Sequence, residues 1–282
     1  MTDALNLSDA FPPVAFIGGG NMASALIGGL RQRGVPAGHI TVVEPQAAAA
    51  EALRTRFGAT VLPSASAALA GAGLVVWAVK PQVFAEAARP VQPHVGGALH
   101  VSVAAGIGTE SIARWLGTPR VVRAMPNTPA LVGQGMTALY ARAAVSAADR
   151  ALAERLIATT GQHLWVDEEA QLDAVTALSG SGPAYVFYFL EAMQEAGAQM
   201  GLTPQQALHL AVATFSGASA LAAQGMQSGD SPATLRERVT SKGGTTFAAL
   251  TALDAAGVKP AFIAAMQAAR LRAQALGREF GG

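Results

Sequence analysis

The sequence predicts an α/β domain over residues 1–166, built on a parallel, doubly wound sheet, followed by an all-helical domain over residues 167–282. In the first part, short apolar segments alternate with helical segments, which favours parallel strands joined by helices. After Asp167 the pattern changes, and only helical segments follow. A length of 282 residues also suits two domains.

The expected strands of the first domain are short and apolar, as is typical of buried strands. They are residues 14–17, 40–43, 60–62, 74–79, 98–103 and 120–124, with 136–140 and 163–166 added at the far edge. The expected helices are residues 21–33, 46–57, a short one ending at Ala70, 111–116 and 147–159. This order of elements gives repeated strand–helix units.

The second domain is expected to contain six helices, over residues 168–178, 184–200, 204–227, 232–240, 245–256 and 260–277. Two of them begin with Ser or Thr followed by Pro at the first helical position, at Thr203-Pro204 and Ser231-Pro232. Glycines at 201, 229 and 257 end others.

The composition excludes several classes of protein. The chain has 19 basic and 18 acidic side chains, which argues against a nucleic-acid binder. It has no cysteine, so disulfides, cysteine-ligated metals and cysteine nucleophiles are excluded, and its five histidines show no metal-ligand spacing. Charged residues make up only 13% and apolar residues 51%, so we expect part of the surface to be buried in a homo-oligomer.

A membrane protein is not expected. The run from Ala67 to Val79 is shorter than the ~20 residues of a spanning helix. The uncharged stretch 196–229 is longer, but it consists mostly of Ala, Gly, Ser, Thr and Gln, which suits a core or a subunit interface better. The first residues are acidic rather than basic, unlike a secretory signal, so we expect a cytoplasmic protein.

A glycine-rich turn follows the first expected strand and opens the first expected helix. Residues 18–23 read G-x-G-x-x-A, in which the glycines allow a tight turn and let the backbone approach a pyrophosphate. The start of the helix adds free N–H groups and a partial positive charge. We therefore expect a Rossmann-like dinucleotide site. Its pyrophosphate contacts are expected at Ile17, Gly18, Gly20, Asn21, Met22 and Ala23.

Polar residues follow three further strands. Glu44 stands where a carboxylate would bind an adenosine ribose and repel a 2′-phosphate, which favours NADH. A solvated strand end is the alternative, and Arg54 and Arg56 on the following helix could offset the charge. Lys80 follows an apolar strand at the edge where such sheets bind ligands, and a charge leaving a buried strand is the alternative. Asn127, between two prolines, suits a carboxamide or a ribose, or simple turn chemistry.

The last candidate site is residues 240–246, which combine hydroxyls and two glycines just before a helix. Backbone N–H groups there can hold a carboxylate, and a capped helix start is the alternative interpretation.

Six stretches of this sequence together resemble the pyrroline-5-carboxylate reductase family over residues 14–278. They are FIGGGNMA (16–23), AVKPQ (78–82), SVAAGI (102–107), RAMPNTPALVGQG (123–135), ALSGSGPAYVF (177–187) and VTSKGGTTFAAL (239–250). The resemblance implies reduction of a cyclic imine to proline with NADPH or NADH, and a C-terminal dimerisation domain. It also implies that the helical domains of two subunits interlock, with the substrate loop of one facing the cofactor domain of the other.

The resemblance also assigns site residues. The nicotinamide half of the cofactor would be lined by Ala78, Val79, Lys80, Pro81, Ala104, Ala105, Gly106 and Asn127. The substrate would be held by Ser241, Gly244, Thr245 and Thr246. We expect the Thr246 hydroxyl to donate to the ring nitrogen. Two positions depart from the family, which often has Pro at Lys242 and Asn near Ala65.

The chemistry agrees with a site that lacks a strong acid or base. A protonated imine is already electrophilic, so hydride addition needs mainly two well-positioned reactants. A β-hydroxyacid dehydrogenase is the first alternative, but such enzymes place a lysine early in the second domain, and this chain has none between Lys80 and Lys242. A non-catalytic nucleotide-binding protein is the second alternative, and it leaves residues 240–246 unexplained.

Overall fold

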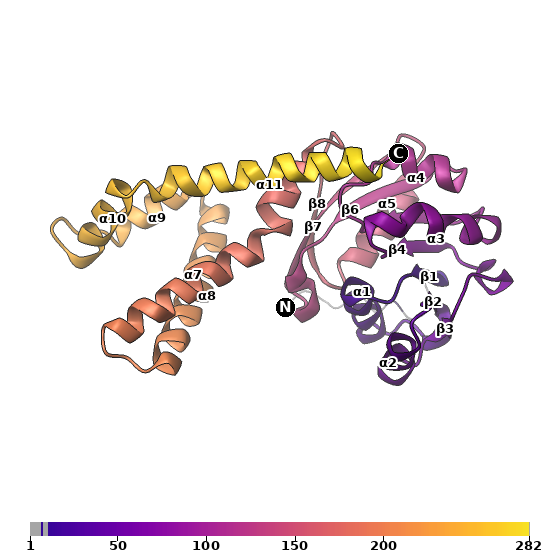
Figure 1. Ribbon diagram of the computed structural model, residues 1–282, viewed down its shortest axis with the longest axis horizontal. Coiled ribbons are helices and arrows are strands. Elements are labelled where there is room, and N and C mark those ends of the chain that lie inside the picture. Colours follow the sequence, from indigo (N-terminus) through magenta and orange to yellow (C-terminus); the bar gives the residue numbers. More distant parts are fainter. Residues whose placement is uncertain (1–6, 8–10, 282) are drawn as a thin grey trace. The chain divides into compact units, whose positions relative to one another are not determined.

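An eight-stranded sheet organises the first part of the computed structural model, which describes Leu7 and residues 11–281 (Figure 1). The strands lie in the order β3-β2-β1-β4-β5-β6-β7-β8, and every neighbouring pair is parallel except β6 and β7. They are β1 (Val14–Ile17), β2 (Ile40–Val43), β3 (Thr60–Leu62), β4 (Leu74–Trp77), β5 (Leu99–Ser102), β6 (Val121–Met125), β7 (Gly135–Ala141) and β8 (Gly161–Trp165). The predicted doubly wound sheet is confirmed.

Helices cover both faces of this sheet (Figure 1). On one face, alternate strand residues such as Val14 and Phe16 pack against α1 (Asn21–Gln32), α2 (Ala47–Phe57) and α5 (Ala147–Ile157). On the other face, Ala15 and Ile17 share a core with α3 (Phe84–Val91) and α4 (Thr109–Leu116). The strands are therefore buried on both sides, which explains their continuous apolar sequence.

Helix α3 is the main element that the sequence analysis left unassigned. It follows a 3₁₀ turn at Pro81–Val83, and it contains Pro90 near its end. Its buried residues Phe84, Ala88 and Val91 have helical spacing, so a signal was present, but the surrounding prolines obscured it.

A buried Trp–His pair lies between β4 and β5. The indole Nε1–H of Trp77 donates to Nδ1 of His100 at 3.1 Å, and both side chains are almost fully buried. Because Nδ1 accepts this bond, the ring is neutral with its proton on Nε2. Burial and the nearby Arg120 lower the pKa of His100 to about 4, although a hydrogen bond with the Val95 backbone opposes the shift.

This pair predicts a loss of stability in mild acid. Between pH 6.5 and 4 the unfolded chain binds a proton at His100 that the folded chain excludes, so the free energy of unfolding falls as the pH is lowered through that window. The difference between the pKa of His100 in the unfolded and folded chain corresponds to about 3 kcal/mol in the free energy of unfolding. Urea unfolding as a function of pH measures it. His100→Gln keeps an acceptor for Trp77 and should lose this part of the pH dependence; an equally steep dependence in the variant would contradict the assignment.

Contacts within the chain define two units, residues 1–181 with 269–282, and residues 182–268. The boundary predicted from the sequence lies instead between residues 166 and 167. Residues 167–181 group with the sheet because α6 (Gln171–Val175) buries Leu172 against Met125 and Ala138, and a π-helical turn (Thr176–Gly180) follows it. Residues 269–282 belong to the first unit because Gly277 packs directly against Gly106.

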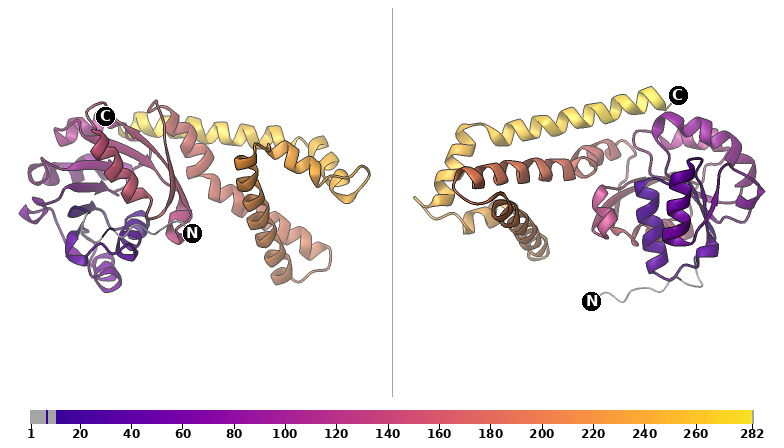
Figure 2. Two further views of the ribbon diagram at one scale, coloured as in Figure 1. Left: turned by 180° about the vertical axis from the view of Figure 1, so that it is seen from behind. Right: turned by 60° about the horizontal axis from the view of Figure 1, so that its bottom comes forward.

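The second unit is helical (Figure 2). Its elements are α7 (Gly182–Gln199), α8 (Pro204–Ser228), α9 (Pro232–Arg238), α10 (Thr245–Ala255) and the first part of α11 (Val258–Phe280). Thr203 and Gln206 form a capping box at the start of α8, and Ser231 caps α9, as their sequence signatures predict. Helices α7 and α8 lie side by side (Figures 1 and 2).

Much of the apolar surface of this second unit is uncovered. The exposed side chains include Phe187, Tyr188, Leu210, Leu221 and Met226, with Met226 82% exposed. Among the described residues, α8 is long and apolar enough by length and composition to cross a membrane, and α10 with α11 passes the same test as a pair bent by 55°. Helix α8 also presents glutamines, serines and a histidine, so its composition alone does not separate a membrane span from a subunit interface.

Candidate active site

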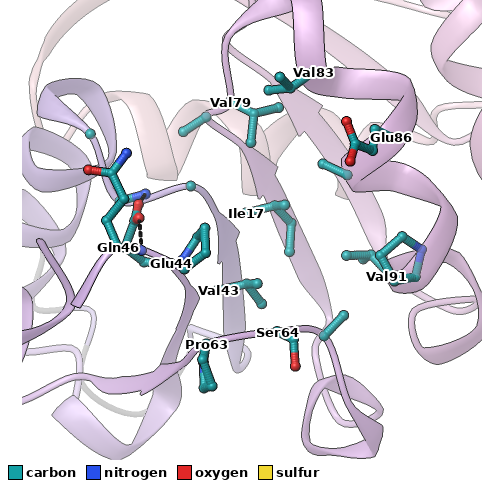
Figure 3. Close-up of a pocket in the computed structure, with 18 of the residues that line it drawn as sticks. Ile17, Val43, Glu44, Gln46, Pro63, Ser64, Val79, Val83, Glu86 and Val91 are labelled. Atoms are coloured by element: carbon teal, nitrogen blue, oxygen red, sulfur yellow. Dashed lines mark hydrogen bonds between the residues drawn. The ribbon is translucent and has the colours of Figure 1, made fainter.

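A cavity of about 620 Å³ opens at the carboxyl ends of β1, β2 and β4 (Figure 3). The strand order reverses between β1 and β4, and ligands of doubly wound sheets bind at such a reversal. The opposite wall is formed by Val83, at the end of the preceding 3₁₀ turn, and by Glu86 and Val91 of α3. The remaining lining residues include Ile17, Gly18, Gly20, Glu44, Ala65, Ala78, Val79 and Lys80.

The glycine turn after β1 needs glycine for two different reasons. Gly18 has φ +94°, and a Cβ there would lie 2.7 Å from the Ala78 carbonyl oxygen, so the turn itself excludes a side chain. Gly20 has an ordinary φ of −70°, and a Cβ there would meet no atom of the described residues within 4 Å. Because the fold leaves this side of Gly20 open, a ligand can approach its backbone.

The start of α1 presents unpaired donors to this space. The N–H of Gly18 donates to Val43, and the N–H of Gly19 donates to Glu44, but within the described part of the chain no acceptor is found for the N–H groups from Gly20 to Ala23. No described side chain caps this end. Free N–H groups at a helix start, flanked by glycine, fit a pyrophosphate.

Glu44 is fixed beside this turn. Its Oε2 accepts from the Gly19 N–H at 2.9 Å and its Oε1 from the Gln46 N–H at 2.8 Å, and the residue is 9% exposed. Each carboxylate oxygen has a second lone pair that remains available to a ribose hydroxyl. The acceptor at the end of β2 is therefore held in place rather than free in solvent.

The other charged residues of the cavity are Lys80 and Glu86. Figure 3 shows Glu86 on α3, across the cavity from Glu44. Glu86 is not among the predicted site residues, because the sequence pattern predicts no helix over residues 84–91. Among the residues that the structure describes, two carboxylates and one cation thus line the cavity.

The residues assigned to the nicotinamide half lie in two places. Ala78, Val79 and Lys80 line the cavity, whereas the turn at Ala104–Gly106 and Asn127 do not. The Asn127 side chain already makes two contacts within the fold, because its Oδ1 accepts from the Met136 N–H at 2.9 Å and its Nδ2 donates to the Ser179 hydroxyl at 3.2 Å. A ligand contact at Asn127 would add to this structural role or replace it.

The glycine-rich loop of the second unit forms an open helix start. Gly243 has φ +73°, and Gly244, at the N-cap of α10, donates its own N–H to the Ser241 carbonyl at 3.0 Å. No described side chain caps α10. Its first N–H groups, from Thr245 onward, are therefore the ones available to a carboxylate.

The side chains of this loop also differ in exposure. Ser241, Lys242 and Thr245 are exposed, while Thr246 is half-buried. A Cβ on Gly244 would lie 2.5 Å from the Ser241 Oγ, so glycine is required for this hydroxyl to sit against the helix start.

Among the described residues, no group of three or more His, Asp or Glu side chains is placed to hold a metal ion.

The fold and the cavity define a dinucleotide-binding oxidoreductase with a helical second unit. Residues 13–106 match a family described as NADP oxidoreductase coenzyme F420-dependent, and residues 169–276 match pyrroline-5-carboxylate reductase dimerisation. The chain belongs to the pyrroline-5-carboxylate reductase family.

Relatives and solved structures support this assignment over nearly the whole chain. A pyrroline-5-carboxylate reductase from Pseudomonas aeruginosa is 46% identical over 96% of this chain and 98% of its own, and one from Haemophilus influenzae is 43% identical over 93% and 96%. The structure of a pyrroline-5-carboxylate reductase from Coxiella burnetii has a TM-score of 0.86 at 36% identity and covers 94% of this chain and 98% of that one. The Plasmodium falciparum enzyme with NADP bound has a TM-score of 0.84 at 25% identity over 94% and 98%.

Proposed function

We propose that this chain reduces 1-pyrroline-5-carboxylate to L-proline with NADH or NADPH. The observation that carries this proposal is the start of α10, which no described side chain caps, because its free N–H groups provide a carboxylate site in a chain of this family. The assay is oxidation of NADH that depends on both the enzyme and the imine. A β-hydroxyacid dehydrogenase would instead reduce NAD⁺ with a 3-hydroxy acid, so running both reactions separates the two functions.

The substrate carboxylate is placed at the start of α10. The N–H groups of Thr245 and Thr246 and the hydroxyl of Ser241 supply donors at the positive end of the helix. Because the Gly244 N–H is already bonded to Ser241, its contribution is to shape the loop. The Thr246 hydroxyl then donates a hydrogen bond to the ring nitrogen, which orients the imine and stabilises the amine that forms.

The cofactor is placed in the cavity at the ends of β1, β2 and β4, and its nicotinamide supplies the hydride. The N–H groups from Gly20 to Ala23 hold the pyrophosphate, and Glu44 binds the adenosine ribose. Ala78 to Pro81, Ala104 to Gly106 and Asn127 form the nicotinamide side, as the family resemblance implies. Bringing two bound reactants together accounts for most of the acceleration.

NADH is the preferred cofactor in this proposal. The start of α2 is the position at which a 2′-phosphate would lie, and there the Glu44 carboxylate already accepts from the Gln46 N–H. The first four residues of α2 are alanines, and Lys80 is the one cation among the described residues that line the cavity. A 2′-phosphate would therefore meet a fixed negative charge, with no basic side chain in the first turn of α2 to offset it.

Replacing Glu44 with serine is expected to improve NADPH relative to NADH. Serine removes the charge that repels the 2′-phosphate, so the ratio of the two Michaelis constants should shift about tenfold or more toward NADPH. Steady-state kinetics with each cofactor measure this ratio. Glu51→Ser, an exposed carboxylate on α2, is the matched control and should leave the ratio unchanged. An unchanged ratio in Glu44→Ser would remove Glu44 from the ribose site.

The second unit is proposed to form a homodimer, alone or within a larger assembly. The uncovered apolar side chains of α7 and α8 fall within residues 169–276, which match the family's dimerisation region. In this arrangement the loop at 240–246 of one subunit faces the cofactor domain of its partner, as the family resemblance implies. Each site would then need two chains.

Light scattering is expected to give at least twice the 28.5 kDa mass of one chain. Leu210→Asp places a charge on the exposed apolar face of α8 and should shift the protein toward monomer, with loss of imine reduction. A monodisperse monomer with full activity would contradict the shared site.

A further inference from the structure

The turn that joins β5 to α4 is braced by a residue from a distant part of the same unit. Glu169 lies 60 residues further along the chain, just before α6. Its Oε1 accepts from the Thr109 N–H at 2.7 Å, and its Oε2 accepts from the Thr109 hydroxyl at 2.6 Å. No side chain in the described local sequence caps Gly108 at the N-cap of α4, and Glu169 takes that role from outside the helix.

Arg123 fixes this carboxylate from the other side. Its Nη1 donates to the Glu169 Oε1 at 3.3 Å, and its Nη2 lies 4.0 Å from the Asp173 Oδ1. Arg123 is only 5% exposed, so its position is set by the surrounding core. A partly buried, charge-assisted network of this kind restrains its members to one arrangement.

The turn itself, residues 103–108, is held at two more points. The Ala104 N–H donates to the Ser102 hydroxyl at 3.3 Å. Gly106 has φ +81°, and a Cβ on Gly277 would lie 2.8 Å from the Gly106 carbonyl oxygen. The last turns of α11 therefore close over one side of the turn, while Glu169 holds its far end.

The contact of Glu169 with Thr109 also distinguishes the start of α4 from the similar start of α10. Helices α4 and α10 both follow a glycine and both lack a local cap. At α4 a carboxylate of the protein already occupies the positive end, whereas the start of α10 is open. The start of α10 can therefore bind the substrate. The start of α4 is occupied by Glu169, which instead shapes the turn before this helix.

We propose that Glu169 is a positioning residue, which holds residues 104–108 in the conformation that receives the nicotinamide end of the cofactor. This inference rests on the proposed function for its catalytic consequence. Glu169 does not touch the reactants. It acts through Thr109 and the turn before it, so its loss should affect the rate of hydride transfer more than the binding of either reactant.

The test compares Glu169→Ala and Thr109→Val with Glu168→Gln. Thr109→Val removes one of the two hydrogen bonds between Thr109 and Glu169, and Glu169 still pairs with Arg123. This variant is therefore used for the test if Glu169→Ala does not fold. Glu168 is an exposed neighbour of the same charge and is the matched control. Three quantities are measured: amide hydrogen exchange of residues 103–110 with and without NADH, the Kd of NADH, and kcat and KM for the imine with NADH and 4-deuterated NADH.

In Glu169→Ala, exchange in residues 103–110 should accelerate about tenfold or more, while exchange in α1 stays unchanged. NADH should bind within about threefold of its normal Kd but no longer protect residues 103–110. We expect kcat to fall about tenfold with little change in the imine KM, and the deuterium isotope effect on kcat to increase. Thr109→Val should show the same pattern more weakly, and Glu168→Gln should match the original protein.

Faster local exchange with unchanged kcat and unchanged NADH protection would overturn the inference, since Glu169 would then only stabilise α4. A fall in kcat that matches an equal fall in the fraction of folded protein would overturn it as well. If the original protein does not reduce the imine, the proposed function fails, and the exchange experiment with NADH alone still decides whether Glu169 positions the turn.

Discussion

Replacing Thr246 with valine is expected to lower kcat/KM for the imine about 10- to 100-fold and to leave NADH binding unchanged. Thr246 is half-buried in the first turn of α10, beside the open N–H groups proposed to hold the carboxylate. Valine keeps the shape of the side chain and removes the hydroxyl. A hydrogen bond whose loss leaves a polar group unpaired is worth roughly 1–3 kcal/mol, which gives this range of effects.

Thr251→Val is the matched control for this substitution. Thr251 is exposed on the same helix, and its hydroxyl donates to the Phe247 carbonyl, so its loss should not alter kcat/KM. Steady-state kinetics and thermal unfolding are measured on both variants. If Thr246→Val keeps kcat/KM and only lowers the melting temperature, Thr246 is a structural residue of the first helical turn and does not contact the imine.

Replacing Gly20 with alanine is expected to weaken NADH binding about 10- to 100-fold without a loss of stability. A Cβ on Gly20 meets no protein atom within 4 Å, and its φ of −70° suits alanine, so the fold tolerates the change. The methyl group would instead project beside the unpaired N–H groups at the start of α1. It would keep the pyrophosphate from approaching them.

Two other glycines make this experiment specific. A Cβ on Gly38 also meets no described atom within 4 Å, and Gly38 does not line the cavity, so Gly38→Ala should leave both stability and NADH binding unchanged. Gly18→Ala should destabilise the fold, because its Cβ would collide with the Ala78 carbonyl at a positive φ. Fluorescence titration with NADH and thermal unfolding separate the three cases. Unchanged NADH affinity in Gly20→Ala would contradict the placement of the pyrophosphate.

Most of the sheet could be predicted because its strands are buried on both faces and so form continuous apolar runs. The run at Leu74–Trp77 illustrates this signal, since all four residues are buried. Helix α3 could not be predicted with the same rules, because Pro81 and Pro90 break the helical pattern that Phe84 and Ala88 begin. The unit boundary also differed, because packing of Leu172 against the sheet is a tertiary contact with no local sequence signal.

The candidate site shows the same division between local and tertiary signals. The glycine turn at residues 18–23 and the helix start at Gly244 carry local signatures, and the structure places both as open helix starts. The partners of Glu44 and Asn127 depend on how distant segments meet, so the sequence indicated their position but not their hydrogen bonds. Glu86 was missed together with its helix. The brace from Glu169 to Thr109 spans 60 residues and has no signature in the sequence.

The most direct test of the central claim is to follow the hydride. The protein is incubated with 1-pyrroline-5-carboxylate and NADH that carries deuterium at the transferable position of the nicotinamide, and the product is examined by mass spectrometry and NMR. The account predicts L-proline with one deuterium on the former C=N carbon, formed in equal amount to the NADH oxidised. Proline without deuterium, or no consumption of NADH in the presence of the imine, would contradict it.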